Sequence, residues 1–234
     1  MRSRRCGIIL AGGASSRLAT AGIVPPGGKA GLVLAGRTLL ERVCERVGAV
    51  VERIVVVAAP GQVLPALAEG VDVVRDSMPG CGPLAGIADG LRAVTRLMPE
   101  AAGVVVVSCD VPVVSPQLLG MLCDRIDPPA GRPASWAGED PPVWVVPEVD
   151  GHLQVMVSVV RPAILAPIGG HLAAGRLDPR SLVERLGMDR PGSVLRVPEA
   201  ELRDIDPDLM SFRDLDTPRD LEELAVFLAS TGER

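Results

Sequence analysis

The chain has 234 residues, a formal net charge of −5, 47% hydrophobic residues and 23% charged residues. This composition argues against disorder and predicts one large domain or two small ones with a sizeable core. The negative charge leaves no basic surface for duplex nucleic acid, and two Phe, two Trp and no Tyr give no platform on which single strands could stack. We therefore expect no nucleic-acid partner.

The five cysteines are widely spaced, and no pair has the C-x-x-C spacing. An odd number of scattered cysteines favours reduced thiols in the cytoplasm over a disulfide framework or a zinc site. The apolar stretch near the start is short and interrupted by glycines, which disfavours a secretory signal. No run reaches the roughly 20 apolar residues that a membrane span requires. We expect a cytoplasmic protein without a membrane partner.

Short, continuously apolar runs alternate with helical patterns along the first half of the chain. The predicted strands are residues 6–13, 53–60, 71–76 and 103–110, and the predicted helices are residues 37–48, 82–98 and 115–126. Thr38 and Glu41 have the spacing of a capping box, and Ser115 followed by Pro116 is a typical helix start. Strands that are apolar on both faces are typical of a mainly parallel sheet covered by helices, so the fold class is α/β.

The pattern becomes less regular after residue 126. Residues 127–142 are rich in Pro and Gly and read as a loop, and residues 143–160 contain two β-rich runs around an Asp150-Gly151 turn. Helices are expected at 164–174, 178–187 and 217–230, with a strand at 192–199. This irregular part is expected to form a second, substrate-specific face.

Open parallel sheets bind ligands at the carboxyl ends of their strands. The first strand ends in Gly12-Gly13, where exposed backbone N–H groups can bind phosphate oxygens. Arg17 can grip phosphate through two parallel hydrogen bonds, and Lys29 adds a point charge. The segment matches neither G-x-G-x-x-G nor G-x-x-x-x-G-K-[ST], so an ordinary connecting loop remains an alternative.

Three further motifs carry acidic residues. Asp110 follows a buried strand in "CDVP" and can bind Mg²⁺, and Asp76 in "DSMPGCGPLAGI" can accept hydrogen bonds from a base or ribose. Asp214 and Asp216 in "FRDLDTPRDL" alternate along an extended segment and can share one face. Each motif also has a purely structural interpretation, as a cap, a turn or a solvated acid.

The order of four motifs resembles that of the molybdenum cofactor guanylyltransferases, which belong to the MobA-like nucleotidyltransferase family. These motifs are, from the N-terminus, "LAGG-x-SSR" with Lys29-Ala30, "DSMPGCGPLAGI", "CDVP" and "DTPRDL". The similarity covers nearly the whole chain. It implies one domain, residues 1–234, with a Rossmann-like three-layer fold and an added β-hairpin region. Residues of about 1–126 would bind the nucleotide, about 127–216 the acceptor, and 217–230 would form a closing helix.

The resemblance implies Mg²⁺-dependent transfer of GMP from GTP to molybdenum-molybdopterin, with release of pyrophosphate. It also implies molybdenum cofactor synthesis proteins or apo-molybdoenzymes as partners. By position in the motifs, backbone groups of Leu10, Ala11, Gly12 and Gly13 would meet the nucleotide, Arg17 and Lys29 the triphosphate, Asp76 the nucleoside, Asp110 the metal, and Asp214 and Asp216 a second metal or the acceptor.

The chain departs from the family pattern at three places. Leu18-Ala19 replaces Met-Gly, and Lys29 comes 12 residues after Arg17, which indicates an insertion. Ala58-Ala59 stands where relatives often have an asparagine, and Asp214 and Asp216 also replace asparagines. The "LAGG" and "GPLAGI" segments favour GTP over CTP. A molybdopterin cytidylyltransferase, another small-molecule nucleotidyltransferase and a non-catalytic nucleotide-binding paralogue remain alternatives.

Overall fold

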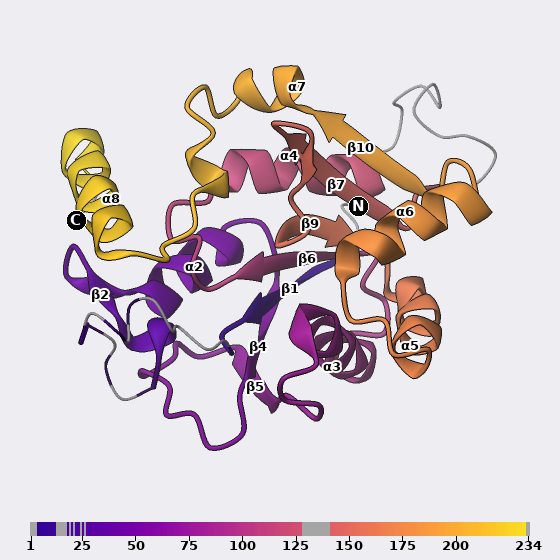
Figure 1. Cartoon of the computed structure of the whole chain (residues 1–234), viewed down its shortest axis with the longest axis horizontal. Helices are drawn as coiled ribbons and strands as arrows, with labels where there is room; N and C mark the ends of the chain where they lie inside the picture. The colour runs from indigo at the N-terminus through magenta and orange to yellow at the C-terminus, as the bar shows by residue number, and fades with distance from the viewer. Residues whose placement is uncertain are drawn as a thin grey trace.

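The computed structural model describes residues 4–12, 18, 20, 22–23, 25, 27–127 and 141–232. Its centre is an eight-stranded sheet with strand order β10-β7-β9-β6-β1-β4-β5, and β8 pairs with β7 (Figure 1). The strands are β1 (Arg5–Leu10), β4 (Arg53–Ala58), β5 (Val71–Arg75), β6 (Gly103–Ser108), β7 (Trp144–Val149), β8 (His152–Leu153), β9 (Val157–Val160) and β10 (Val194–Pro198). The predicted α/β class and the mostly parallel sheet are confirmed.

Four consecutive strands of the sheet, β6, β1, β4 and β5, are parallel. The direction reverses at β9, which is antiparallel to both β6 and β7, whereas β10 is parallel to β7. The short strand β8 is also antiparallel to β7. The carboxyl ends of β1, β4, β5 and β6 therefore meet at one edge of the sheet. Residues predicted to follow these strands are brought to that edge by topology alone.

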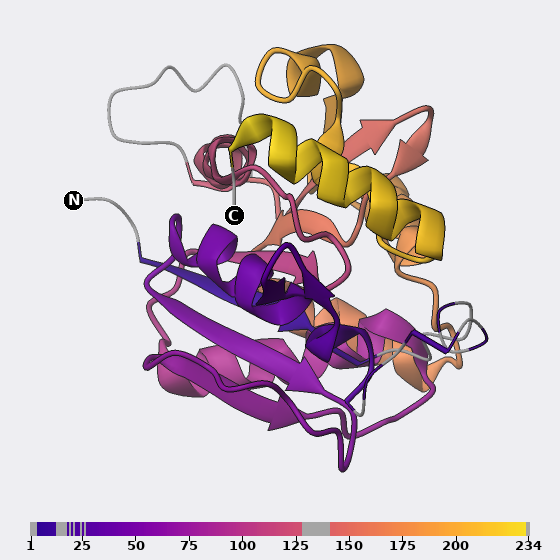
Figure 2. The same ribbon diagram turned by 90° about the vertical axis from the view of Figure 1, so that its left-hand side faces the viewer.

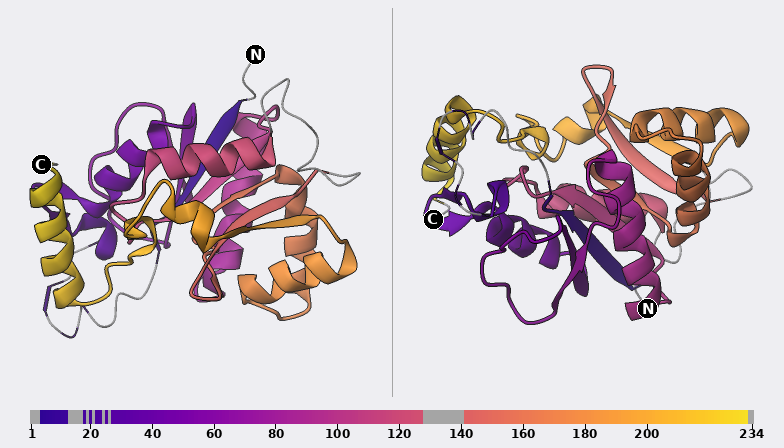
Figure 3. Two further views of the ribbon diagram at one scale, coloured as in Figure 1. Left: turned by 90° about the horizontal axis from the view of Figure 1, so that it is seen from above. Right: turned by 60° about the horizontal axis from the view of Figure 1, so that its bottom comes forward.

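Helices cover both faces of the sheet (Figures 1 and 3). One buried cluster joins α2 (Leu39–Gly48), α4 (Pro116–Ile126) and α7 (Glu199–Arg203) to the sheet, and the other joins α3 (Gly82–Leu97), α5 (Leu165–Ala173) and α6 (Pro179–Asp189). Alternation along β1 serves both clusters, because Ile8 and Leu10 pack on one side and Ile9 on the other. Strands buried on both faces explain the continuous apolar runs in the sequence.

A third cluster lies away from the sheet. It joins α8 (Pro218–Thr231) to the short hairpin of β2 (Val33–Leu34) and β3 (Arg37–Thr38) through Leu34, Leu224 and Leu228. Figures 1 and 2 show α8 beside this N-terminal segment, although the two are far apart in the sequence. The last helix therefore closes over the segment that follows the glycine-rich loop.

Most predicted helices begin and end within a few residues of the observed ones, and the predicted capping box is present. Glu41 N donates to Thr38 Oγ1 over 3.2 Å, and Thr38 N donates to Glu41 Oε2 over 2.7 Å. The Asp150-Gly151 turn is also confirmed, since both residues have positive φ, 49° and 72°, and Val149 pairs with His152. Such angles are those of a two-residue hairpin.

Several elements were not predicted from the sequence. The second β-rich run is split into β8 and β9, and the β2–β3 hairpin, α7 and the short 3₁₀ helices at Lys29–Gly31, Pro162–Ile164 and Met210–Phe212 are additional. These pieces are too short for a periodic pattern. Most of the predicted Pro- and Gly-rich loop, residues 128–140, lies outside the described residues. No helix in the described part of the chain has both the length and the apolar character needed to span a membrane.

Replacement of Gly90 in α3 by Ala is expected to destabilise the protein by about 1–2 kcal/mol. The added Cβ would lie 2.7 Å from Cγ2 of Ile8, a side chain with no exposed surface. Overpacking would lower the free energy of unfolding by about 1–3 kcal/mol, which exceeds the gain of about 1 kcal/mol from the higher helix propensity of Ala. Urea unfolding measures the difference.

Gly120 in α4 is the matched control, because nothing lies within 4 Å of an added Cβ there. Gly120→Ala should therefore stabilise the protein by up to about 1 kcal/mol. Equal effects of the two substitutions would contradict the tight packing of α3 on β1.

Candidate functional site

Hydrogen bonds between neighbouring backbones continue beyond the ends of the central strands. Ala11 N donates to Val57 O over 2.8 Å, and Cys109 N donates to Leu10 O over 3.0 Å. Gly12 follows directly beside the backbone of Ala59, where an added Cβ would lie 3.4 Å from Ala59 N. Three strands thus hold the start of the glycine-rich loop at the carboxyl edge of the sheet.

A narrow cavity of about 450 Å³ opens at this edge, between the strand ends and the start of α3. Its lining residues are Leu10, Gly12, Val57, Ala59, Asp76, Pro79, Gly80, Gly82, Pro83, Gly86, Ser108 and Met156. Of the residues predicted to bind a nucleotide, Leu10, Gly12 and Asp76 lie here. Half of these lining residues are glycine or proline, so part of the wall is backbone without a long side chain.

A wider cavity of about 1020 Å³ adjoins the narrow one. The two share Pro83, Ser108 and Met156, and the wide cavity also includes Asp110 and Asp214. Its other walls come from the β7–β8 hairpin, the start of α6 and residues 203–213. Two ligands bound in these cavities would meet at the end of β6.

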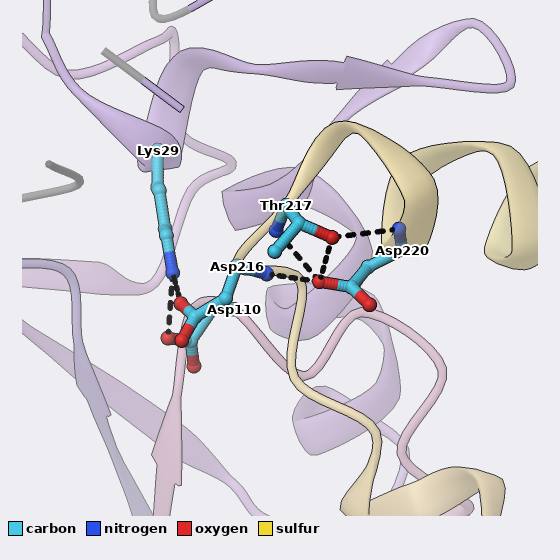
Figure 4. A network of polar contacts seen from close by, with 5 residues as sticks. All are labelled: Lys29, Asp110, Asp216, Thr217 and Asp220. Carbon is cyan, nitrogen blue, oxygen red and sulfur yellow. Dashed lines mark hydrogen bonds and ion pairs between the residues drawn. The ribbon is translucent and has the colours of Figure 1, made fainter. Parts of the chain in front are cut away.

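Lys29 lies between two carboxylates near this junction. Its Nζ donates to Asp110 Oδ2 over 3.3 Å and to Asp216 Oδ1 (Figure 4). The Lys29 side chain is only 12% exposed, while those of Asp110 and Asp216 are 23% and 34% exposed. A single buried ammonium therefore joins the loop, the end of β6 and the segment before α8.

Backbone contacts hold the two carboxylates in place. Leu215 N donates to Asp110 O over 2.8 Å, which ties the C-terminal segment to the end of β6. Asp216 N and Thr217 N both donate to Asp220 Oδ2, over 3.0 and 2.6 Å, and Asp220 N donates back to Thr217 Oγ1 over 3.3 Å (Figure 4). This capping box starts α8 and sets the position of Asp216.

The charges at the site shift two pKa values. Burial lowers the pKa of Lys29, but the carboxylates of Asp216 and Asp110 outweigh burial and raise it above its ordinary value. Partial burial, followed by repulsion from Asp216 and Asp110, raises the pKa of Asp214. At neutral pH the site therefore combines one protonated ammonium with an excess of acidic groups.

Asp76 has a structural task in addition to its place in the narrow cavity. Its Oδ1 accepts a hydrogen bond from Met78 N over 2.9 Å, and Ser77 N donates to Asp89 Oδ2 over 2.7 Å. These bonds fix the turn that leads into α3. The helix begins after Cys81 without a side-chain cap, unlike α2, α4, α6 and α8. The first N–H groups of α3 thus lack a side-chain capping partner.

The structure brings most of the predicted site residues to one edge of the sheet, namely Leu10, Ala11, Gly12, Lys29, Asp76, Asp110, Asp214 and Asp216. Gly13 and Arg17 lie outside the described residues. The roles of all these predicted residues in binding and catalysis stay predictions. Met156, Gln62 and Arg180 were not among the predicted site residues, and it is the tertiary structure that brings them to this edge of the sheet.

The chain is similar to known nucleotidyltransferases over most of its length. The model of the MobA-like NTP transferase domain matches residues 7–189. A molybdenum cofactor guanylyltransferase of Desulfosudis oleivorans is 30% identical over 221 residues, which are 93% of this chain and 92% of that protein. The enzyme of the same name from Rhizobium meliloti is 42% identical over 118 residues, about half of each chain (49% and 50%).

The comparison with solved structures gives a similar result. The crystal structure of molybdopterin-guanine dinucleotide biosynthesis protein A from Archaeoglobus fulgidus superposes with a TM-score of 0.70 at 22% identity, covering 96% of this chain and 99% of that one. At this identity the likeness concerns the fold. Together with the family match and the relative that spans nearly the whole chain, it leads to one conclusion. The chain belongs to the MobA-like NTP transferase domain family and is a nucleotidyltransferase.

Proposed function

We propose that this enzyme transfers GMP from GTP to molybdenum-molybdopterin and releases pyrophosphate. The observation that carries the proposal is the pair of adjoining cavities that meet at Ser108, two residues before Asp110. A transfer reaction between two large substrates requires two such compartments and a charged junction. The names of the similar guanylyltransferases supply the identity of the two substrates.

The narrow cavity suits the nucleoside of GTP. Gly80 and Gly82 have positive φ values of 82° and 74°, so the wall offers backbone groups without side chains. The first turn of α3 has no side-chain cap, so its N–H groups, among which Pro83 contributes none, would donate to oxygen atoms of the base or the phosphates. All residues lining this cavity except Met156 precede residue 126, which supports the proposed nucleotide-binding part of the domain.

The wide cavity suits the acceptor. Most of its lining residues lie between 149 and 214, within the proposed acceptor-binding part, while α8 closes over the N-terminal segment. Arg203 donates to Glu199 and Arg213 is 3.7 Å from Glu223, so both have carboxylate partners. Arg180 has no ion-pair partner in the described part of the chain. We assign it to the phosphate of the acceptor.

A divalent cation fits the junction. Nucleotidyltransferases of this family generally use a divalent metal, and the carboxylates of Asp110 and Asp216 are hard oxygen ligands of the kind that Mg²⁺ prefers. No three acidic, His or Cys side chains converge on one point among the described residues, so phosphate and water oxygens would complete the coordination. Bound Mg²⁺ would neutralise charge on the triphosphate.

The chain itself supplies positioning and charge. An oxygen of the acceptor phosphate attacks the α-phosphorus of GTP, the new P–O bond forms, and the bond to the β-phosphate oxygen breaks as pyrophosphate leaves. The acceptor phosphate is already anionic, so no side chain has to remove a proton from it. Lys29 and the backbone around Gly12 offset the negative charge, and the two cavities bring the reacting atoms together.

CTP is the second candidate nucleotide. Asp214 and Asp216 replace asparagines of the guanylyl branch, and Ala59 lines the narrow cavity where a relative would place an asparagine. We further propose that molybdenum cofactor synthesis proteins or apo-molybdoenzymes exchange the product with this enzyme in the cytoplasm. Failure of the chain to co-purify with any of them would speak against this partnership.

Pyrophosphate release from GTP, with Mg²⁺ and molybdenum-loaded molybdopterin, tests the function. Asp110→Asn should lower kcat/KM by about 100-fold or more, because the mutant loses a carboxylate ligand of the cation that would stabilise the developing negative charge. Asp189→Asn, at the exposed end of α6, should retain wild-type activity. Release from CTP alone would assign the chain to the cytidylyl branch, and nucleotide binding without any release would favour a non-catalytic paralogue.

Lys29 is the only lysine of the chain, so isotope-labelled lysine marks this residue alone. NMR titration of its Cε signal should give a pKa above the ordinary 10.5, and Asp216→Asn should lower it. Because the pKa is raised in the folded state, the ion pairs stabilise the fold fully below pH 10.5 and lose this effect as pH rises through the folded pKa. A pKa at or below the ordinary value would refute the paired geometry.

Arg180→Ala should raise the KM for the acceptor about tenfold, since a hydrogen bond between charged groups is worth roughly 1.5–3 kcal/mol. The KM for GTP should stay within about twofold, because Arg180 does not line the narrow cavity. Arg176→Ala is the control, since Arg176 is exposed and lines neither cavity. A parallel increase of both KM values would contradict the assignment.

A further inference from the structure

The side chain of Gln62 bridges three loops at the carboxyl edge of the sheet. Its Oε1 accepts a hydrogen bond from Ala59 N over 2.9 Å. Its Nε2 donates to Ala11 O over 3.0 Å and to Gly27 O over 2.8 Å. One carboxamide thus connects the ends of β1 and β4 to the segment that precedes Lys29.

Gly27 meets this bridge in a second way. Its φ is +112°, and an added Cβ would lie 2.3 Å from Val63 O, so only glycine permits this close approach of the two backbones. Two residues later Lys29 begins a 3₁₀ turn, in which Leu32 N donates to Lys29 O over 2.9 Å and Ala30 is buried. The backbone of Lys29 is therefore fixed from both sides.

The segment that carries Gln62 is itself anchored. Gln62 N donates to Ala59 O over 3.1 Å, and Nη1 of Arg75, the last residue of β5, donates to Ala59 O over 3.1 Å and to Gln62 O over 2.9 Å. These bonds fix the backbone around Gln62 at the carboxyl edge of the sheet. Gln62 is therefore held in a fixed position relative to the ends of β4 and β5.

We propose that Gln62 is a positioning residue, which holds the end of the extended glycine-rich loop so that Lys29 is directed at the junction of the two cavities. Lys29 comes 12 residues after Arg17, and a connection of that length does not by itself determine where Lys29 lies. The bonds from Gln62 to Gly27 and Ala11 provide that constraint. The inference rests on the proposed function, since Lys29 is assigned to the triphosphate.

Gln62→Glu is the sharpest variant. The carboxylate keeps an oxygen that accepts from Ala59 N. Its second oxygen replaces Nε2, the donor group, and faces two carbonyl oxygens, Ala11 O and Gly27 O. Gln62→Met keeps the length without any polar atom and serves as the second variant. Gln117→Glu makes the same change at an exposed position at the start of α4, outside both cavities, and is the matched control.

Affinity for GTP with Mg²⁺ and without acceptor, measured by calorimetry, is the first readout. In protein that a cooperative melting transition shows to be folded, both Gln62 variants should raise Kd about tenfold or more, and Gln117→Glu should bind as wild type does. In a Lys29→Met background, Gln62→Glu should cost no further affinity, because residues that act through one another are not additive. A full additional loss in the double variant would indicate a merely structural role and overturn the inference.

The NMR signal of Lys29 tests the same point without nucleotide. The Cε signal should move toward that of an exposed lysine in both Gln62 variants and stay unchanged in Gln117→Glu. An unchanged Lys29 signal in the Gln62 variants overturns the inference, whatever happens to GTP affinity. If wild type fails to bind GTP, the proposed function fails, and the NMR comparison still decides whether Gln62 positions Lys29.

Discussion

The ion pairs of Lys29 with Asp110 and Asp216 are the constraint on which the site depends. They join residues 81 and 187 positions apart in the sequence, from the loop after β1, the end of β6 and the segment before α8. Burial of an unpaired ammonium would be strongly unfavourable, and two carboxylates with favourable geometry offset it. The capping box at Thr217 and the bond from Leu215 to Asp110 are needed to keep these carboxylates in reach.

The sheet explains why such distant residues meet at all. Parallel strands place their carboxyl ends at one edge, so the pairing of the strands alone brings the residues after β1, β4, β5 and β6 together. The antiparallel β9 then lets the chain build the second wall, because it carries Met156 close by on its N-terminal side, at the border of the two cavities. The narrow and the wide cavity thus adjoin where the strand direction changes at β9.

The sequence was sufficient for features that depend on local or periodic patterns. The apolar runs around Ile8 and Val105, the capping box at Thr38 and the Asp150-Gly151 turn are coded within a few residues. The pairing of Lys29 with Asp216 is not, because it depends on how α8 packs on the β2–β3 hairpin. The same holds for Gln62, whose three hydrogen bonds all go to backbone atoms and leave no motif.

The choice of lysine at position 29 follows from the same geometry. The chain has 24 basic residues, and this is the one that is not arginine. A compact ammonium with three donors fits between two carboxylates at 12% exposure, whereas a planar guanidinium pairs best with one carboxylate through two parallel hydrogen bonds. Lysine also separates two requirements. Gln62 and Gly27 fix the position of its backbone, while the flexible four-carbon stem would let the charge follow the phosphate oxygens of the proposed substrate.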